Sequence, residues 1–257
     1  MKVLSIGTDR KLFEEGSAVR MRSIEYGTKM QELHIVVFTT SQKSKVKSQK
    51  LSKNVFVYPT NSGSKFLYIF DAIKSGKKII KENKFTRGDS VITCQDPFEC
   101  GFVGYKISKV FNLPLHIQIH TDFLSPYFKT GILQRIRVSL AKFILPKADG
   151  VRVVSERIAD SIEKAKIELK NRPKILPIHV DSDIIEKSPS IDLRATFPNF
   201  KFFILMASRL TTEKRIKDAL SVFQKVLKHY PFAGLLIAGQ GSEGNKLKRL
   251  AKKLGIS

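Results

Sequence analysis

The sequence lacks long apolar runs, and it has few cysteines and few acidic residues. No run of about eighteen or more apolar residues occurs, so no segment is predicted to cross a membrane. The apolar run before Thr8 is too short for a secretory signal and predicts a first buried strand. Cys94 and Cys100 match no zinc or redox spacing, and we expect half-buried thiols of a reducing compartment. These absences favour a cytoplasmic location.

The shortage of acidic residues leaves a strong positive charge, because 46 lysines and arginines stand against 23 acids, a net charge of +23. Such a charge attracts a polyanion, which is a nucleic acid, an anionic membrane surface or a phosphorylated substrate. Basic residues are densest in segments 43–53, 74–87 and 134–147. We interpret the first as a solvated loop or helix face. The third alternates basic and apolar residues at helical spacing, which fits both a core-packed helix and a helix peripheral to the inner membrane leaflet.

Short apolar segments alternate with segments of helical periodicity along the whole chain. The expected strands are Val3–Ile6, Leu33–Thr39, Val55–Tyr58, Ser90–Thr93, Leu115–Ile119, Gly150–Val154, Lys174–Ile178, Phe202–Ala207 and Gly234–Ala238. The expected helices are Ala18–Met30, Phe66–Ile80, Gly101–Phe111, Ile158–Leu169, Ile216–His229 and Asn245–Leu254. The strands are continuously apolar, which is typical of parallel sheets covered on both faces. The sequence therefore predicts an α/β fold.

The alternation is interrupted once, between Ile178 and Lys201. This stretch is rich in aspartate and proline and contains no long element, although a short helix fits within it. We predict a first domain over 1–180, a linker over 181–200 and a second domain over 201–257. Asp181 and Asp183 form an Asp-x-Asp pattern, which we assign to the linker and not to a metal site.

Ligands of open α/β sheets bind at the carboxyl ends of the strands, so the residues that follow each strand are the candidates. Gly16 and Ser17 start a helix, whose free backbone N–H groups make an anion site or serve only as a cap. His120 and Asp122 follow the strand Leu115–Ile119, and the histidine has either a structural role or one in proton transfer or hydrogen bonding. Asp96 is predicted to cap a helix that carries Glu99 at its third position.

The second domain offers a cluster of cations after its first strand. Arg209 leaves the strand Phe202–Ala207, and Lys214 is expected in the first turn of the following helix. Both cations then converge on the helix N-terminus and form a diphosphate clamp. The alternative is a surface ion pair between Arg209 and Glu213. After the next strand, Gly239 and Gly241 form a tight turn that permits close approach by a ligand.

Together these segments resemble the retaining GT-B glycosyltransferases of family 4, also called group 1. Ser208–Lys214 resembles the family signature G-R-L-x-x-E-K, and Leu235–Gly241 with the following Ser242 and Glu243 resembles its V-I-V-G-D-G-P-E strand and turn. Similar acceptor-domain segments are Gly16–Arg20, Thr93–Glu99, Gln118–Asp122 and Val154–Ser155. The resemblance implies a complete N-terminal Rossmann-like domain with a parallel sheet, followed by a partial second Rossmann-like domain.

The resemblance also implies an activity and roles for residues. Its members move a hexosyl group from a nucleotide-diphosphate sugar to a glycan or lipid-linked acceptor, with retention and with no metal or other cofactor. Arg209 and Lys214 stabilise the leaving diphosphate, and His120 hydrogen-bonds the transferred sugar. The implied donor contacts are Gly16, Ser17, Arg209, Lys214, Gly239 and Gly241. The implied acceptor contacts are Arg20, Asp96, Glu99 and Asp122.

The sequence departs from the family pattern in ways that leave other functions open. Glu15 precedes Gly16, and Ser208 and Arg215 stand where the family has glycine. No Glu-x7-Glu motif follows before Ser257, so we expect a C-terminally truncated donor domain. One alternative is an inactive fragment or subunit that needs a complementing donor-domain fragment. Another is a basic nucleic-acid-binding protein, although no motif for specific nucleic acid occurs. A dinucleotide oxidoreductase is disfavoured because no G-x-G-x-x-G follows the first strand.

Overall fold

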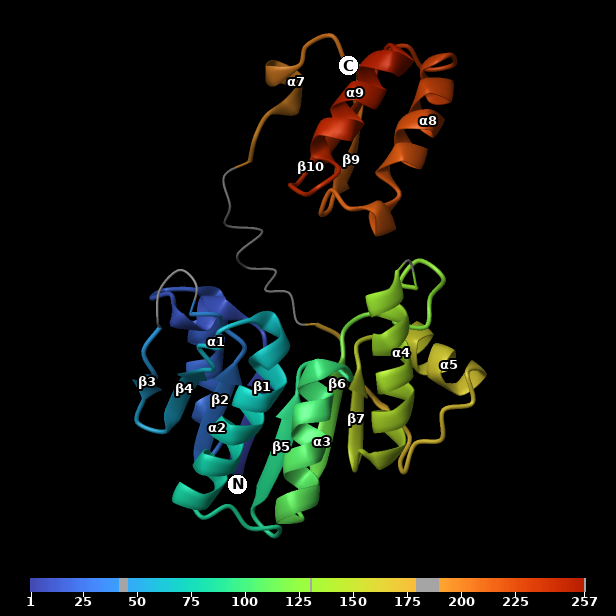
Figure 1. The fold of residues 1–257 in the computed structure, drawn as a ribbon. Coiled ribbons are helices and arrows are strands. Elements are labelled where there is room, and N and C mark those ends of the chain that lie inside the picture. Colours follow the sequence, from blue (N-terminus) through green and yellow to red (C-terminus); the bar gives the residue numbers. More distant parts are fainter. Residues whose placement is uncertain (42–45, 130, 179–189, 257) are drawn as a thin grey trace. The chain divides into compact units, whose positions relative to one another are not determined.

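The chain divides into two compact units, Met1–His179 (unit 1) and Val180–Ser257 (unit 2), both drawn in Figure 1. The computed structural model describes residues 1–41, 46–129, 131–178 and 190–256. Residues 181–189 of the predicted linker, including Asp181 and Asp183, therefore lie outside the described residues. In the remainder of that linker a short helix, α7, spans Leu193–Thr196 and is capped by the Asp192 side chain.

Unit 1 is built on one eight-stranded sheet. Its strands are β1 (Lys2–Gly7), β2 (Glu32–Val37), β3 (Gln49–Ser52), β4 (Val55–Pro59), β5 (Ser90–Cys94), β6 (Leu115–Ile119), β7 (Gly150–Val153) and β8 (Lys174–Ile175). They lie in the order β3-β4-β2-β1-β5-β6-β7-β8, and every neighbouring pair is parallel except β3 and β4. The predicted α/β fold with a mostly parallel sheet is confirmed.

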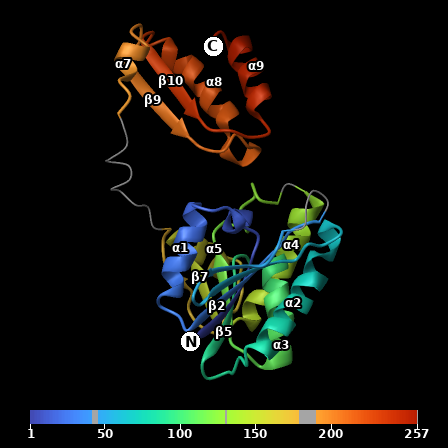
Figure 2. The ribbon, with the colours of Figure 1, turned by 90° about the vertical axis from the view of Figure 1, so that its left-hand side faces the viewer.

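Helices cover both faces of this sheet. They are α1 (Ala18–Gly27), α2 (Tyr68–Glu82), α3 (Glu99–Phe111), α4 (Ile132–Ile144) and α5 (Glu156–Lys164), with short 3-10 turns η1 (Arg10–Phe13), η2 (Lys65–Leu67) and η3 (Leu145–Lys147). Figure 2 shows α1 on one side of the strands and the layer of α2, α3 and α4 on the other. Within this layer α3 packs against both α2 and α4.

Successive residues of β1 reach opposite faces, as strand geometry requires. Leu4 belongs to the large core beneath α2, α3 and α4, whereas its neighbour Val3 belongs to a smaller core with Leu12 of η1. Both residues are buried, so the centre of the sheet is covered on both sides. This explains why β1 has the continuous apolar sequence of a doubly covered parallel strand.

The direction of the chain reverses at the middle of the sheet. From β1 the chain moves outward through β2 and β4, returns by α2 to β5, and continues in the other direction. The carboxyl ends of β1 and β5 therefore flank the topological switch point, where open α/β sheets bind their ligands.

Unit 2 contains two parallel strands and two helices. The strands β9 (Phe202–Ala207) and β10 (Ala233–Ala238) pair along their whole length. The helices α8 (Ile216–Leu227) and α9 (Gly244–Leu254) pack on them through a core that contains Ile216, Leu220 and Leu247. The 3-10 turn η4 (Thr212–Lys214) precedes α8. Unit 2 thus continues the strand-helix alternation of unit 1 on a smaller scale.

Three local predictions were wrong. Segment 43–53, expected as a loop or helix face, contributes the edge strand β3, although residues 42–45 lie outside the described part. The strand expected over 174–178 ends at Ile175. Cys94 and Cys100 are fully buried and not half-buried, and burial raises the pKa of both thiols well above the ordinary range.

Candidate functional site

The loop after β1 leads into the N-terminus of α1. Gly16 has a φ of 72°, a left-handed conformation that favours glycine. Ser17 caps the helix, and its hydroxyl accepts a hydrogen bond from the Arg20 N–H. The N–H groups of Ala18 and Val19 have no hydrogen-bond partner among the described residues. Two unpaired donors and the positive end of the helix dipole make this position suited to an anion.

Arg20, predicted to contact the acceptor, lies one turn into α1. Its guanidinium donates to Gln49 Oε1 of β3 at 2.7 Å. In this structure the side chain therefore joins α1 to the edge of the sheet. The contact comes from β3, the strand that periodicity did not predict.

The switch point itself contains a residue that the sequence did not single out. Gln95 follows β5, and its Oε1 accepts a hydrogen bond from the Thr8 N–H at 3.2 Å. A Cβ atom at Gly7 would clash with the same oxygen, so only glycine there lets the amide cross the end of β1. Gln95 thereby ties the two loops at the switch point together. Its nearness to Gly7 depends on strand order, which a local motif does not report.

Asp96 and Glu99 form the entry to α3, but the cap differs from the predicted one. The helix begins at Glu99, and Asp96 Oδ1 accepts hydrogen bonds from the N–H groups of Phe98 and Cys100. Burial raises the pKa of the Asp96 carboxyl. The single Nε–H of Arg137 in α4 is shared between the two carboxylate oxygens of Glu99, at 2.8 and 3.1 Å. Both carboxylates are thus engaged within unit 1, one by backbone and one by an arginine.

His120 and Asp122 lie in the loop after β6, as expected. Partial burial lowers the pKa of the His120 imidazole, and the positive charge of Arg152 lowers it further. A neutral imidazole donates one hydrogen bond and accepts another. Asp122 Oδ2 accepts from the Ser161 hydroxyl at 3.3 Å. Its Oδ1 is buried and has no hydrogen-bond partner within the described ranges, so it retains the capacity to accept one hydrogen bond.

A polar network runs across β5, β6 and β7 toward His120. The Thr93 hydroxyl lies 2.9 Å from His116 Nδ1 and accepts a hydrogen bond from Gln118 Nε2 at 3.1 Å. Arg152 donates to Gln118 Oε1 at 3.4 Å and to the Leu176 carbonyl at 2.9 Å. Sequence analysis missed this network because its members come from three strands. The network holds the Arg152 guanidinium at a position where its positive charge lowers the pKa of His120.

In unit 2 the loops after β9 and β10 are held together by backbone hydrogen bonds. Ser208 N–H donates to the Ala238 carbonyl, Leu210 N–H to that of Gln240, and Glu243 N–H to that of Leu210. A Cβ atom at Gly239 would clash with the Ser208 carbonyl oxygen, and one at Gly241 would clash with that of Leu210. The two glycines therefore permit a close approach of the chain to itself.

The two cations of the predicted clamp occupy different environments from those expected. Lys214 lies in η4, and Arg215, with a φ of 52°, separates it from α8, so the prediction that Lys214 belongs to the first helical turn was wrong. Arg209 is paired with Glu213 at 3.3 Å, the alternative considered from the sequence. Its side chain is still 75% exposed, so the pair is weak and open to exchange with an anionic ligand.

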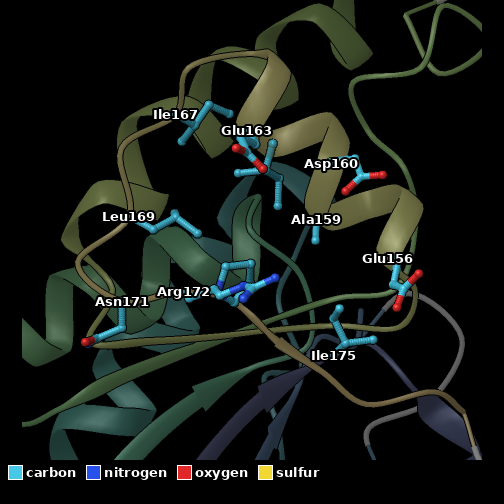
Figure 3. Close-up of a pocket in the computed structure, with 11 residues that line it drawn as sticks. Glu156, Ala159, Asp160, Glu163, Ile167, Leu169, Asn171, Arg172 and Ile175 are labelled. Carbon is cyan, nitrogen blue, oxygen red and sulfur yellow. The ribbon is translucent and has the colours of Figure 1, made fainter.

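Two hollows on the described part of the surface lie beside other residues. A cavity of about 460 Å³ lies beside α5. Glu163, Leu169 and Arg172 are among the residues that line it (Figure 3). None of the residues predicted for donor or acceptor lines it. In unit 2 a hollow of about 20 Å³ lies between Thr211, Arg215 and Glu243, which suits a water and not a nucleotide.

Comparison with known proteins shows which proteins the chain is similar to. Residues 191–257 match Glycosyl transferases group 1. They include the loop after β9, which carries Arg209 (the Arg209 loop), and the loop after β10, which carries Gly239. The chain is therefore similar to the group 1 glycosyltransferases over this segment. It is 26% identical over 212 residues to an uncharacterized glycosyltransferase of Methanocaldococcus jannaschii, a match that covers 79% of this chain and 52% of that protein.

A second relative is an alpha-monoglucosyldiacylglycerol synthase of Streptococcus pneumoniae, 29% identical over 180 residues, or 65% of this chain and 40% of that one. The chain thus spans about half the length or less of these curated relatives. Among solved structures, a trehalose-6-phosphate synthase is similar with a TM-score of 0.62 and 13% identity, covering 98% of this chain and 68% of that one. This likeness confirms the predicted GT-B type of fold.

Proposed function

We propose that this chain is a group 1 glycosyltransferase and takes part in the transfer of a sugar from a nucleotide-diphosphate donor to an acceptor. The observation that supports the proposal best is the Arg209 loop. It lies at the carboxyl end of β9 and is hydrogen-bonded to the glycine turn after β10. It presents an exposed guanidinium that, among the described residues, is paired with Glu213. In this proposal the donor diphosphate displaces Glu213, and Arg209 and Lys214 stabilise the negative charge that develops on the leaving group.

The remaining predicted residues, all of unit 1 except the glycines of unit 2, have further roles in this proposal. The unpaired N–H groups of Ala18 and Val19, after Gly16 and Ser17, bind a donor phosphate oxygen. His120, whose lowered pKa keeps the imidazole neutral at pH 7, donates a hydrogen bond to the transferred sugar. Asp122 accepts a hydrogen bond from an acceptor hydroxyl through its unpaired Oδ1. Because Arg209 and Lys214 neutralise the diphosphate, the reaction proceeds without a metal.

Transfer occurs with retention of the anomeric configuration in this proposal. The similar trehalose-6-phosphate synthase is described as an enzyme of glycosyl transfer with retention, and the synthase relative from Streptococcus pneumoniae is named for an alpha product. Proton NMR of the product, with a panel of nucleotide-diphosphate sugars and EDTA present, tests both features. The expected result is one donor whose anomeric configuration persists in the product. An inverted product contradicts retention, loss of turnover in EDTA contradicts metal independence, and no turnover with any donor contradicts the activity.

The exposed side chains of β9 favour a second candidate, in which the chain acts as a subunit completed by another donor-domain segment. Phe202, Ile204 and Leu205 are all exposed on this strand. Apolar parallel strands are ordinarily covered on both faces. Titration of the chain with a donor-domain segment that carries a Glu-x7-Glu motif tests this candidate. Binding of the segment to the unchanged chain, together with loss of binding in Leu205→Asp, supports this candidate. Absence of binding to the unchanged chain rejects it.

A further inference from the structure

Helix α4 has an apolar stripe that faces solvent. Its buried side contains Val138, Ala141 and Ile144, as in any helix packed on a core. On the opposite side Ile132 is 80% exposed and Ile136 is 57% exposed, and Leu133 and Phe143 are exposed as well. The helix contains three basic residues and no acid. It therefore packs on the core by one face and presents apolar and cationic side chains on the other.

A second exposed apolar cluster lies at the start of α2. Phe66 in η2 is 89% exposed, and Phe70 in the first turn of α2 is 69% exposed. Along the same side of the helix follow Lys74 and Lys78, at four-residue spacing from Phe70. The other side of α2 is buried through Ala72, Gly76, Ile79 and Ile80. Two exposed phenylalanines followed by lysines repeat the composition of the α4 stripe.

The two clusters belong to one layer of unit 1. Figures 1 and 2 show α2, α3 and α4 side by side on the face of the sheet opposite α1. Both clusters lie at the N-terminal ends of their helices. Since α2 follows β4 and α4 follows β6, both ends lie toward the carboxyl edge of the parallel sheet. We call Phe66, Leu67, Phe70, Ile132, Leu133 and Ile136, with Lys74 and Arg135, the α2–α4 patch.

We propose that the α2–α4 patch docks unit 1 onto an anionic lipid surface. Large apolar side chains next to lysine and arginine are the composition of helices that lie in the lipid interface. The apolar groups enter the boundary between headgroups and acyl chains, and the cations contact lipid phosphates. The net charge of +23 adds long-range attraction to such a surface.

Charge and composition favour lipid over the other occupants of such a patch. A nucleic acid would use the cations and leave the exposed phenylalanine and isoleucine side chains without a partner. The buried centre of a protein interface is poor in lysine, whereas here Lys74 follows the phenylalanines by one helical turn. Docking does not depend on sugar transfer, so the experiment tests binding and not turnover.

Tryptophan fluorescence gives the first test because the chain contains no tryptophan. Phe66→Trp and Ile132→Trp each introduce one reporter at an exposed position of the patch. With vesicles of phosphatidylcholine containing about 30% phosphatidylglycerol, both emissions are expected to shift to the blue and to be quenched by brominated lipid. Tyr26→Trp on α1, at the opposite face, is expected to do neither. Reporters that stay unshifted in both patch variants overturn the proposal.

Cosedimentation with the same vesicles gives the second test. The double variants Phe66→Ser/Phe70→Ser and Ile132→Ser/Ile136→Ser are each expected to lower the partition coefficient by about tenfold or more. The matched control, Met21→Ser/Tyr26→Ser, replaces two exposed residues of α1 and is expected to change it by less than about twofold. Since all these side chains are exposed, circular dichroism of the variants is expected to match that of the unchanged chain.

Two results would assign the patch otherwise. Binding to anionic vesicles that is unchanged in both double variants and disappears at about 1 M salt would show adhesion by charge alone. Concentration-dependent self-association that both double variants abolish, without vesicle binding, would assign the patch to a second copy of the chain. Either result overturns docking by the α2–α4 patch.

Discussion

The two units bury strands of similar sequence to different extents. In unit 1 the residues from Val3 to Ile6 of β1 are all buried between helices on both faces. In unit 2 the equally apolar β9 has Leu205 at 66% exposed, and Phe202 and Ile204 are exposed as well. The cations proposed to bind the donor lie in the smaller unit, within the segment that matches the group 1 glycosyltransferases. Stability and donor binding are therefore tested by substitutions in different units.

The largest expected effect comes from truncating one leucine in each unit. Leu4→Ala in β1 removes a fully buried side chain and is expected to lower the free energy of unfolding by about 2–5 kcal/mol. Leu205→Ala in β9 removes an exposed one and is expected to change it by less than about 0.5 kcal/mol. Urea unfolding followed by circular dichroism measures both. Equal losses would mean that burial does not distinguish the two sheets.

The next effect concerns the contact between the loops that follow β9 and β10 in unit 2. Gly239 has a φ of 150°, and a Cβ atom there meets the Ser208 carbonyl oxygen. Gly239→Ala is expected to destabilise unit 2 by about 1–3 kcal/mol, because the loops must separate. Gly88→Ala in unit 1, where a Cβ meets nothing within 4 Å, is the control. Hydrogen exchange of β9 and β10 amides measures the difference, and unchanged protection in Gly239→Ala would refute it.

A smaller effect is expected from pH in unit 1. Burial is the main cause that lowers the pKa of His34, His116 and His120 below 6.5. The unfolded chain therefore binds protons that the folded chain does not, and stability falls as pH decreases below about 6.5. Thermal unfolding between about pH 7.5 and 5.5, above most carboxyl pKa values, is expected to show a falling midpoint. His116→Gln is expected to reduce the dependence of the unfolding midpoint on pH. An unchanged dependence would show that His116 does not contribute to it.

The smallest effect compares one ion pair from each unit. The Arg137 Nε–H is shared between both carboxylate oxygens of Glu99 and the pair is largely shielded, whereas Arg209 and Glu213 are exposed. Double-mutant cycles are expected to give a coupling of about 1 kcal/mol for the first pair. The second pair is expected to give less than about 0.5 kcal/mol. A stronger coupling for Arg209 and Glu213 would argue against their exchange with a ligand.

The sequence predicted the elements whose patterns are local. The bounds of β6 and β9 agree with the expected strands, and α8 and α9 begin within one residue of their predicted starts. The strand β3 was missed because Gln49, Lys50 and Ser52 are polar and because β3 lies at the edge of the described sheet, where it pairs with β4. An edge strand is specified by pairing more than by its own apolar pattern.

The candidate site was less predictable because its partners come from distant segments. The sequence around Arg20 does not indicate that this side chain contacts Gln49. The sequence around Gly7 likewise does not indicate that Gln95 lies next to it. The position of Lys214 was wrong because Arg215 adopts a left-handed conformation that interrupts the helix, and arginine gives no sequence signal for that. The roles proposed for Arg209, His120 and the other site residues stay predictions.

The central claim is that Arg209 binds a donor diphosphate, and calorimetric titration with uridine, guanosine and adenosine diphosphates tests it most directly. The titration uses the unchanged chain, Arg209→Ala, and the control Arg249→Ala, which removes an exposed arginine of α9 in the same unit. We predict that one nucleotide binds the chain and the control equally in EDTA, with affinity lowered at least about tenfold in Arg209→Ala. Equal affinity of Arg209→Ala for that nucleotide would contradict the account.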